Sequence, residues 1–162
     1  MISRNFKQGR KMNKILSAAL GASMFALAVF ADTSMQVYKS PTCGCCGNWG
    51  KIMAKNGFES IEIKTNDLVE VKNKFHVPLE LSSCHTAIVD GYVVEGHVPP
   101  AEVKRLLELK PDGVIGISVP GMPLESPGMQ QGSKPEKYDV ILFKKDGTQE
   151  IFATYIGDKK LQ

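Results

Sequence analysis

Apolar and polar residues alternate along several short stretches of the chain, and this period of two is typical of strands with one buried face. Residues 35–39 and 58–64 alternate in this way. Two further β-rich runs lie on either side of Asp90-Gly91, a dipeptide that favours the tight turn of a hairpin. The first half of the chain is therefore expected to contain four strands, the last two of them paired.

Helical periodicity separates these strands, because three segments place apolar residues three or four positions apart between start and stop residues. They are 46–56, with Trp49 as its core anchor and Asn56-Gly57 at its end; 68–75, capped by Asn66-Asp67; and 101–109, opened by Pro99-Pro100. The order β-α-β-α-β-β-α is that of the thioredoxin and glutaredoxin class. We expect an α/β protein with a thioredoxin-like fold, in which helices flank a central mixed sheet.

The C-terminal part of the chain has a different pattern, with a strand, a long loop and a second hairpin. A short strand is expected over 114–119, and a Gly- and Pro-rich loop follows it at 120–129. Residues 138–143 and 149–155 alternate again around an Asp-Gly turn and predict a C-terminal β-hairpin extension. We expect the tail at 157–162 to be frayed.

The first 31 residues have the composition of a secretory signal peptide. A basic region without acidic residues precedes an apolar run at 15–30, and Val29-Phe30-Ala31 suits signal peptidase. A retained membrane anchor is the alternative, but the apolar run is shorter than the roughly 20 residues that span a bilayer. We therefore predict that 1–31 is cleaved, that the protein is exported to the periplasm without a stable membrane anchor, and that 32–162 forms one domain.

Removal of that segment changes the charge of the protein. The whole chain has 20 Lys and Arg residues against 17 Asp and Glu residues, a formal net charge of +3. The segment contains five basic residues and no acidic ones, which leaves 15 against 17 and a formal net charge of −2. The basicity belongs to the signal peptide, so we expect no nucleic-acid partner.

Three of the four cysteines, Cys43, Cys45 and Cys46, lie directly after the strand expected at 35–39. Cys43 and Cys46 have the C-x-x-C spacing of a redox or metal site. Thiols at the start of a helix lie near unpaired backbone N–H groups and the positive end of the helix dipole, which favour the thiolate. Disulfide exchange does not require the third thiol, Cys45, and this surplus is the first indication of a metal site.

The fourth cysteine, Cys84, lies immediately before the expected hairpin. In the thioredoxin class, the loop before the third strand lies against the dithiol and usually carries a cis-proline, and here Cys84-His85 takes that place. Four sulfurs from two loops would then form one pocket. Thiolate clusters select soft ions, Cu(I) above all, and can bridge several of them. Zinc is the rival, but contiguous cysteines differ from the separated knuckles of structural zinc sites.

Two histidines and two methionines are candidate secondary ligands or supports of the ligands. His85 follows Cys84 directly, so its imidazole is equally suited to bind a metal or to point away from it. His97, at the far end of the hairpin's return strand, is expected to be structural or at the helix entry, with ligation as the alternative. Met122 and Met129 offer soft thioethers, or simply pin their loop onto the domain near the site.

Several of these motifs together resemble the CopG-type family of exported metal-binding proteins, which is associated with bacterial copper resistance. The resemblance covers roughly 36–155, nearly the whole mature chain. It implies a thioredoxin-like fold, copper held by the four cysteines, and interconversion of Cu(I) and Cu(II). The segments that carry it are Tyr38-Lys39-Ser40-Pro41-Thr42-Cys43-Gly44-Cys45-Cys46, Ser83-Cys84-His85-Thr86-Ala87, Val94-Glu95-Gly96-His97-Val98-Pro99, Val119-Pro120-Gly121-Met122-Pro123 and Ser126-Pro127-Gly128-Met129.

Three functions are compatible with these residues. The first hypothesis is a periplasmic copper-binding protein for copper resistance, with a Cu(I)/Cu(II) site that could be multinuclear; whether it is an enzyme, a copper oxidoreductase, is left open. Its partners would be copper ions and periplasmic copper efflux or chaperone proteins. The second is a thiol-disulfide oxidoreductase that attacks with Cys43 and resolves with Cys46. The third is a structural protein in which Cys84 is disulfide-bonded to a clustered cysteine.

Overall fold

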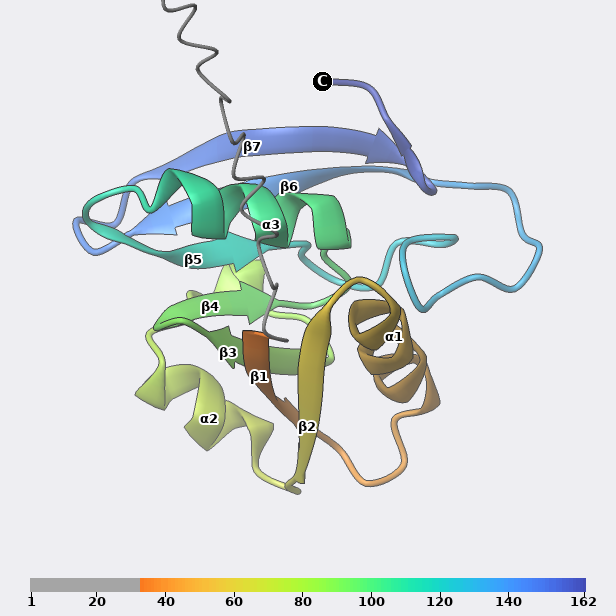
Figure 1. The fold of residues 1–162 in the computed structure, drawn as a ribbon, viewed down its shortest axis with the longest axis horizontal. Coiled ribbons are helices and arrows are strands. Elements are labelled where there is room, and N and C mark those ends of the chain that lie inside the picture. The colour runs from red at the N-terminus through yellow and green to blue at the C-terminus, as the bar shows by residue number, and fades with distance from the viewer. Residues whose placement is uncertain (1–32) are drawn as a thin grey trace, which may run out of the picture.

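The computed structural model describes residues 33–162, so the signal peptide predicted at 1–31 lies outside the described residues. Figure 1 shows a mixed α/β architecture in which helices pack against a single twisted sheet. The elements are β1 (Thr33–Lys39), α1 (Gly44–Lys55), β2 (Phe58–Lys64), α2 (Leu68–Lys74), the 3₁₀ turn η1 (Leu79–Leu81), β3 (His85–Val89), β4 (Tyr92–Glu95), α3 (Pro100–Leu109), β5 (Val114–Ser118), β6 (Lys137–Lys144), β7 (Gln149–Ile156) and β8 (Lys159–Lys160).

The described strands form one eight-stranded sheet in the order β2-β1-β3-β4-β5-β6-β7-β8. β1 pairs in parallel with β2, and β4 in parallel with β5, while the other neighbours are antiparallel. The hairpin predicted at Asp90-Gly91 is present, with Val89 opposite Tyr92. Both turn residues have positive φ, 47° and 80°, which is the requirement of a tight two-residue turn.

The two faces of the sheet have separate apolar cores, because successive strand residues point to opposite sides. α1 and α3 cover one face, where Trp49 and Leu106 pack in the larger cluster with strand residues such as Val94. On the other face, Val77 and Leu81 from the segment after α2 pack against Val93 and Phe143. Trp49 is fully buried and its indole Nε1 donates to the Val98 carbonyl at 2.9 Å, so its predicted role as a core anchor is confirmed.

Most element bounds differ from the sequence predictions by one or two residues, and two of the differences affect the site or the tail. α1 begins at Gly44 rather than at residue 46, because the backbone of Cys43 is extended and acts as the helix N-cap. The prediction of a frayed tail at 157–162 is wrong: β8 pairs with β7, the Leu161 N–H donates to the Thr154 carbonyl at 2.7 Å, and Lys160 Nζ donates to Glu102 at 2.8 Å.

The closing hairpin of β6 and β7 is present, and it continues the same sheet because β6 pairs with β5. Within residues 33–162, no helix has the length and apolar character needed to cross a membrane.

Candidate metal centre

Strand pairing brings the two cysteine-bearing segments to one end of the sheet. β1 runs antiparallel to β3, and its last residue, Lys39, lies opposite His85, the first residue of β3. The turn that follows β1 and the residue that precedes β3 must therefore be neighbours. That turn leads into α1, so Cys43, at the helix N-cap, meets Cys84 although the two are 41 positions apart.

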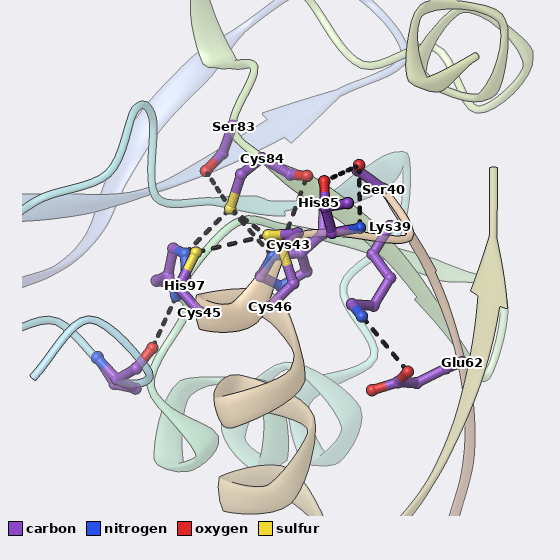
Figure 2. The surroundings of a disulfide bond; sticks show 12 residues. Lys39, Ser40, Cys43, Cys45, Cys46, Glu62, Ser83, Cys84, His85 and His97 are labelled. Atoms are coloured by element: carbon purple, nitrogen blue, oxygen red, sulfur yellow. Dashed lines mark hydrogen bonds and ion pairs between the residues drawn. A yellow bond between two sulfur atoms is a disulfide. The ribbon is translucent and has the colours of Figure 1, made fainter. Parts of the chain in front are cut away.

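The four cysteine sulfurs lie within 4.8 Å of one another, as Figure 2 shows. Cys43 and Cys46 form a disulfide with a Cα–Cα distance of 5.5 Å. Each bonded sulfur has a free thiol beside it: Cys45 Sγ is 3.5 Å from Cys43 Sγ, and Cys84 Sγ is 3.6 Å from Cys46 Sγ. The juxtaposition expected from the fold is present, but four thiolates form only after reduction of this disulfide.

The disulfide also decides between hypotheses made from the sequence. A structural bridge between Cys84 and a clustered cysteine is wrong, since the bridge joins Cys43 to Cys46 and Cys84 is free. The C-x-x-C spacing places these two residues one helical turn apart, which suits the Cα separation that a disulfide requires.

His97 lies directly across the β3–β4 hairpin from Cys84. The pair Thr86–Glu95 sets the register, and two further steps outward along the hairpin bring residue 84 opposite residue 97. His97 Nε2 is 3.0 Å from Cys84 Sγ, and Nδ1 is 2.8 Å from the carbonyl oxygen of Pro127. Because a carbonyl can only accept, Nδ1 carries the proton and Nε2 presents its lone pair to the sulfurs.

This geometry makes His97 a stronger candidate ligand than its position in the sequence suggested. The hairpin turn was recognised in the sequence, and counting outward from it would have paired residues 84 and 97.

His85 is fully buried behind the sulfurs, with its ring centroid 4.5 Å from that of Trp49 and 5.1 Å from that of His97. Its Nδ1 is 3.4 Å from Cys84 Sγ, and its Nε2 has no hydrogen-bond partner among residues 33–162. A buried imidazole nitrogen without a partner is unusual in a folded protein. His85 can therefore supply a second nitrogen donor next to Cys84, as one of the two sequence alternatives proposed.

Burial controls the protonation of these groups. It lowers the pKa of His85 well below its ordinary value, with further lowering by His97, Lys72 and Lys39. Burial also lowers the pKa of His97, partly offset by its hydrogen bond to the Pro127 carbonyl. Both imidazoles are thus neutral and able to donate a lone pair. Burial, followed by the neighbouring Cys45, raises the pKa of the Cys84 thiol to about 12.

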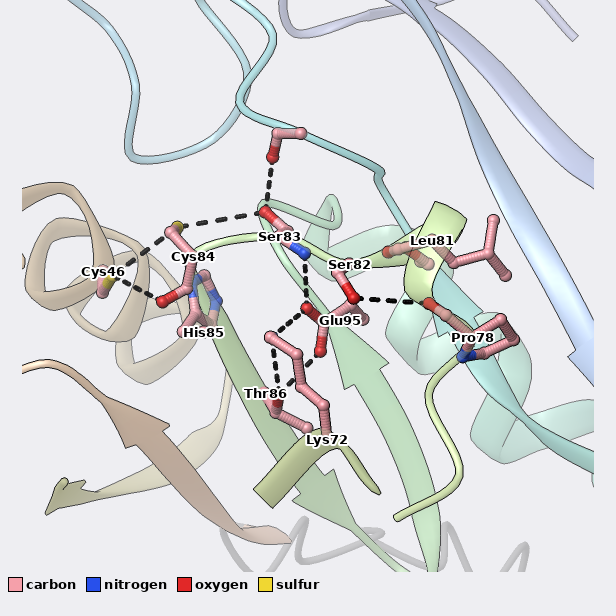
Figure 3. Close-up of polar contacts among 12 residues, drawn as sticks. Cys46, Lys72, Pro78, Leu81, Ser82, Ser83, Cys84, His85, Thr86 and Glu95 are labelled. Carbon is pink, nitrogen blue, oxygen red and sulfur yellow. Dashed lines mark hydrogen bonds and ion pairs between the residues drawn. The ribbon is translucent and has the colours of Figure 1, made fainter. Parts of the chain in front are cut away.

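A buried polar cluster holds the Cys84 segment from the other side, as Figure 3 shows. The carboxylate of Glu95, with 0% exposure, accepts from the Ser83 backbone N–H at 2.6 Å, from Thr86 Oγ1 at 2.7 Å and from Lys72 Nζ. Lys72 Nζ also donates to Thr86 Oγ1 at 3.1 Å. Burial raises the pKa of Glu95, although Lys72 and the other donors oppose that shift. The cluster fixes the backbone one residue before Cys84.

The loop after β5 closes the remaining side of the site. Ser83 Oγ donates to the Gly121 carbonyl, and the Gly121 N–H donates to the Ser82 carbonyl at 3.1 Å. Gly128 has φ +90°, and a Cβ there would lie 2.8 Å from the backbone nitrogen of Trp49 and 2.9 Å from the carbonyl oxygen of Cys45. The loop therefore rests against the first turn of α1, near the cysteines as predicted.

The two loop methionines lie in different environments, since Met122 is 55% exposed and Met129 is 8% exposed. The loop reaches the site through the Pro127 carbonyl and the Gly128 backbone. Ligation by either thioether stays a prediction.

The donor set is soft: after reduction of the disulfide it offers four cysteine sulfurs, which bind metal as thiolates, and two neutral imidazoles. Thiolate sulfur and imidazole nitrogen are the donors that Cu(I) and Zn²⁺ accept, whereas hard ions such as Mg²⁺ and Ca²⁺ prefer oxygen. Two residue groups have their donor atoms within 4.8 Å of one another: the four cysteines, and Cys84 with His85 and His97. Cys84 belongs to both groups, so the arrangement fits a site in which sulfurs bridge more than one ion.

Comparison with known proteins agrees with this geometry. Residues 81–129 match the family described as "Protein of unknown function, DUF411". Two solved structures, described as "Copper resistance protein copG- Form 1" and "Form 2", are each 37% identical to this chain with a TM-score of 0.73. The matches cover 78% and 76% of this chain and 99% and 98% of those chains. No curated protein matches.

The fold and the clustered donors thus define a mixed α/β protein with a candidate soft-metal centre at one end of its sheet. Identity of 37% over almost the entire length of the two solved structures shows the family, and the chain belongs to the CopG family.

Proposed function

We propose that this protein binds copper in the periplasm and acts in copper resistance, holding the metal between the N-terminal end of α1 and the segment before β3. One observation carries the proposal: the donor atoms of the four cysteines lie within 4.8 Å of one another, and Cys84 forms a second such group with His85 and His97. The names of the two CopG structures supply the choice of copper among the soft metals. Copper is the cargo of such a protein.

Reduction of the Cys43–Cys46 disulfide provides the four thiolates of the proposed site. Four thiolates stabilise Cu(I), and sulfurs packed this closely can bridge two or more ions. His97 adds a nitrogen donor whose orientation the Pro127 carbonyl fixes, and His85 is the second candidate. Because nitrogen donors tolerate Cu(II), we propose that the mixed set also permits interconversion of the two oxidation states, which would make the protein a copper oxidoreductase.

The thioredoxin-like assignment remains part of the proposal for the segment from β1 to α3. Its support is the arrangement β2-β1-β3-β4 with β1 and β2 parallel, together with a C-x-x-C motif at the start of the first helix. Export rests on the sequence of residues 1–31. Copper efflux or chaperone proteins remain the proposed partners.

Anaerobic titration with Cu(I) tests the binding proposal. The fully reduced protein is titrated in competition with a chromophoric Cu(I) chelator, and bound copper is counted by elemental analysis. We expect at least one Cu(I) per protein, a loss of affinity of tenfold or more in Cys84→Ser, and a similar loss in His97→Asn.

The exposed His76 provides the matched control. It lies in a loop with φ 56°, a conformation that Asn tolerates, so His76→Asn should bind Cu(I) as the unaltered protein does. The proposal is wrong if the reduced protein takes up no Cu(I), or if Cys84→Ser leaves both stoichiometry and affinity unchanged.

Thiol-disulfide exchange is the second candidate function, and the Cys43–Cys46 disulfide favours it. Cys43 is partly exposed while Cys46 is fully buried, which is the asymmetry expected of an attacking and a resolving thiol. The free thiols at both ends of the disulfide count against it, because they offer competing partners. Rapid reduction of insulin by the metal-free protein, abolished in Cys43→Ser, would support exchange over copper handling.

A further inference from the structure

We propose that the Cys43/Cys46 dithiol is the electron source that reduces Cu(II) at this site, while Cys45, Cys84 and His97 hold the Cu(I) that is formed. The inference rests on the proposed copper-binding function and assigns two separate tasks to the four cysteines. One pair is oxidised and the other pair remains as thiolate ligands.

The structure selects which pair is oxidised. Cys43 and Cys46 are joined at a Cα–Cα distance of 5.5 Å, inside the range of about 4.4–6.8 Å found for disulfides. Cys45 and Cys46 are adjacent in sequence, which disfavours a bond between them. Cys84 Sγ lies 3.6 Å from Cys46 Sγ, but it also faces His97 Nε2 at 3.0 Å and belongs to the second donor group. Cys84 is thus placed to bind metal.

The two remaining thiols are spaced to hold an ion after the disulfide has formed. Cys45 Sγ and Cys84 Sγ lie within 4.8 Å of each other. Metal–thiolate bonds of about 2.3 Å allow one ion to bridge sulfurs about 4.6 Å apart. His97 Nε2 lies against Cys84 with its lone pair free, and the Pro127 carbonyl keeps it in that orientation. The oxidised protein thus retains a soft two-sulfur, one-nitrogen site for Cu(I).

The electrons balance with two cupric ions per protein. Each thiol of Cys43 and Cys46 loses its proton to solvent, the two sulfurs form the disulfide, and the two electrons released reduce two Cu(II) to two Cu(I). The only oxidant needed is Cu(II), which is the substrate.

A further cycle needs a dithiol reductant, such as a reduced thioredoxin-class protein or a small dithiol. Cys43 is the accessible end of the disulfide and Cys46 the buried end. A thiolate of the reductant attacks Cys43 Sγ, Cys46 leaves as thiolate, and the second thiol of the reductant then resolves the mixed disulfide. Two electrons return to the protein and the reductant becomes a disulfide.

The test adds two equivalents of Cu(II) to the fully reduced, metal-free protein under argon. Loss of the Cu(II) paramagnetic signal, Cu(I) captured by a chromophoric chelator, and alkylated thiols counted by mass spectrometry are measured on the same sample. We expect two Cu(I) per protein, a fall from four alkylatable thiols to two after chelation, and a peptide that carries the Cys43–Cys46 bond. The first-order rate constant for disulfide formation should not depend on protein concentration, because both thiols belong to the same molecule.

A variant separates this route from general thiol oxidation. Cys46→Ser leaves Cys43 beside Cys45 without a C-x-x-C partner, and we expect the initial rate of Cu(II) reduction to fall at least tenfold. His76→Asn is the control and should match the unaltered protein. Peptide mapping of the unaltered protein tests the inference even if Cys46→Ser folds poorly.

Two results would overturn the inference: a disulfide that maps to Cys45 or Cys84, or Cu(II) reduction that consumes no thiols. A direct Cu(I) titration of the same preparation separates the two proposals. If Cu(I) binds while Cu(II) yields no Cys43–Cys46 disulfide, the electron source is wrong and copper binding stands. If Cu(I) does not bind either, the proposed function fails first.

Discussion

The buried pair of Glu95 and Lys72 offers the sharpest test of how the site is supported. Glu95→Gln keeps the shape of the side chain and an amide oxygen that can still accept from the Ser83 N–H. It removes the negative charge and leaves the Lys72 ammonium, whose side chain is only 11% exposed, without its partner. Removing one member of a buried ion pair costs about 3–5 kcal/mol. Because Lys72 retains some solvent contact, we expect a cost of about 3 kcal/mol.

The double variant Lys72→Met/Glu95→Gln removes the unpaired charge as well. Replacement of a buried ion pair by groups of similar size is often neutral, so we expect it to lie within about 1 kcal/mol of the unaltered protein. Urea unfolding of the reduced, metal-free protein measures both values. Trp49 is the single tryptophan, and its complete burial should make its fluorescence report the loss of the core.

Copper affinity can be measured for Glu95 variants in addition to their stability. Glu95→Gln should stay within a few fold of the unaltered Cu(I) affinity, because the Ser83 N–H keeps an acceptor. Glu95→Ala should lose about 10- to 100-fold, the usual effect of removing a group that orients a ligand. If Glu95→Gln costs less than about 1 kcal/mol, or if the double variant is as unstable as the single one, the cluster does not act as a buried ion pair.

Three further predictions concern the packing around the cysteines. Trp49→Phe leaves a buried carbonyl without its donor and should cost at least about 1–3 kcal/mol by urea unfolding followed by circular dichroism; an unchanged midpoint would contradict it. Gly128→Ala and Gly132→Ala both place a side chain at positive φ, but only Gly128→Ala meets neighbouring backbone, so it should cost at least about 1 kcal/mol more, and equal costs would refute the close packing of the loop. In the disulfide form, burial raises the pKa of Cys84 to about 12 and so disfavours its thiolate at pH 8. Iodoacetamide should therefore modify the other free thiol, Cys45, first, and mass spectrometry of alkylated peptides checks the order.

The sequence predicted much of this fold because its local signals agree with its long-range pairing. Asp90-Gly91 fixes a two-residue turn, and the β-rich runs on both sides pair in the register that this turn sets. Asp67 caps α2 through a hydrogen bond to the Glu70 N–H at 2.8 Å, as the pattern indicated. The convergence of Cys84 on the cysteines at the start of α1 was expected from the thioredoxin class, in which the loop before the third strand lies against the dithiol.

Features that depend on contacts across the fold were less accessible. The ordered tail depends on Lys160 meeting Glu102, which is 1% exposed within α3, and no local pattern links the two. The orientation of His97 depends on a carbonyl 30 positions away in an irregular loop. The buried Lys72–Glu95 pair resembles two ordinary surface charges in the sequence, because an amphipathic helix usually exposes lysine.

The length of the β3–β4 hairpin is itself a constraint on the metal centre. One residue added to or removed from the turn at Asp90-Gly91 would shift the return strand by one position and turn its side chains to the opposite faces. His97 would then move away from Cys84, and Glu95 would leave Lys72 and the Ser83 N–H, although every ligand residue would still be present. The site therefore depends on the separation of 13 positions between Cys84 and His97 as much as on the identities of these two residues. Substitutions in this hairpin can tune the site, whereas a single insertion or deletion would dismantle it.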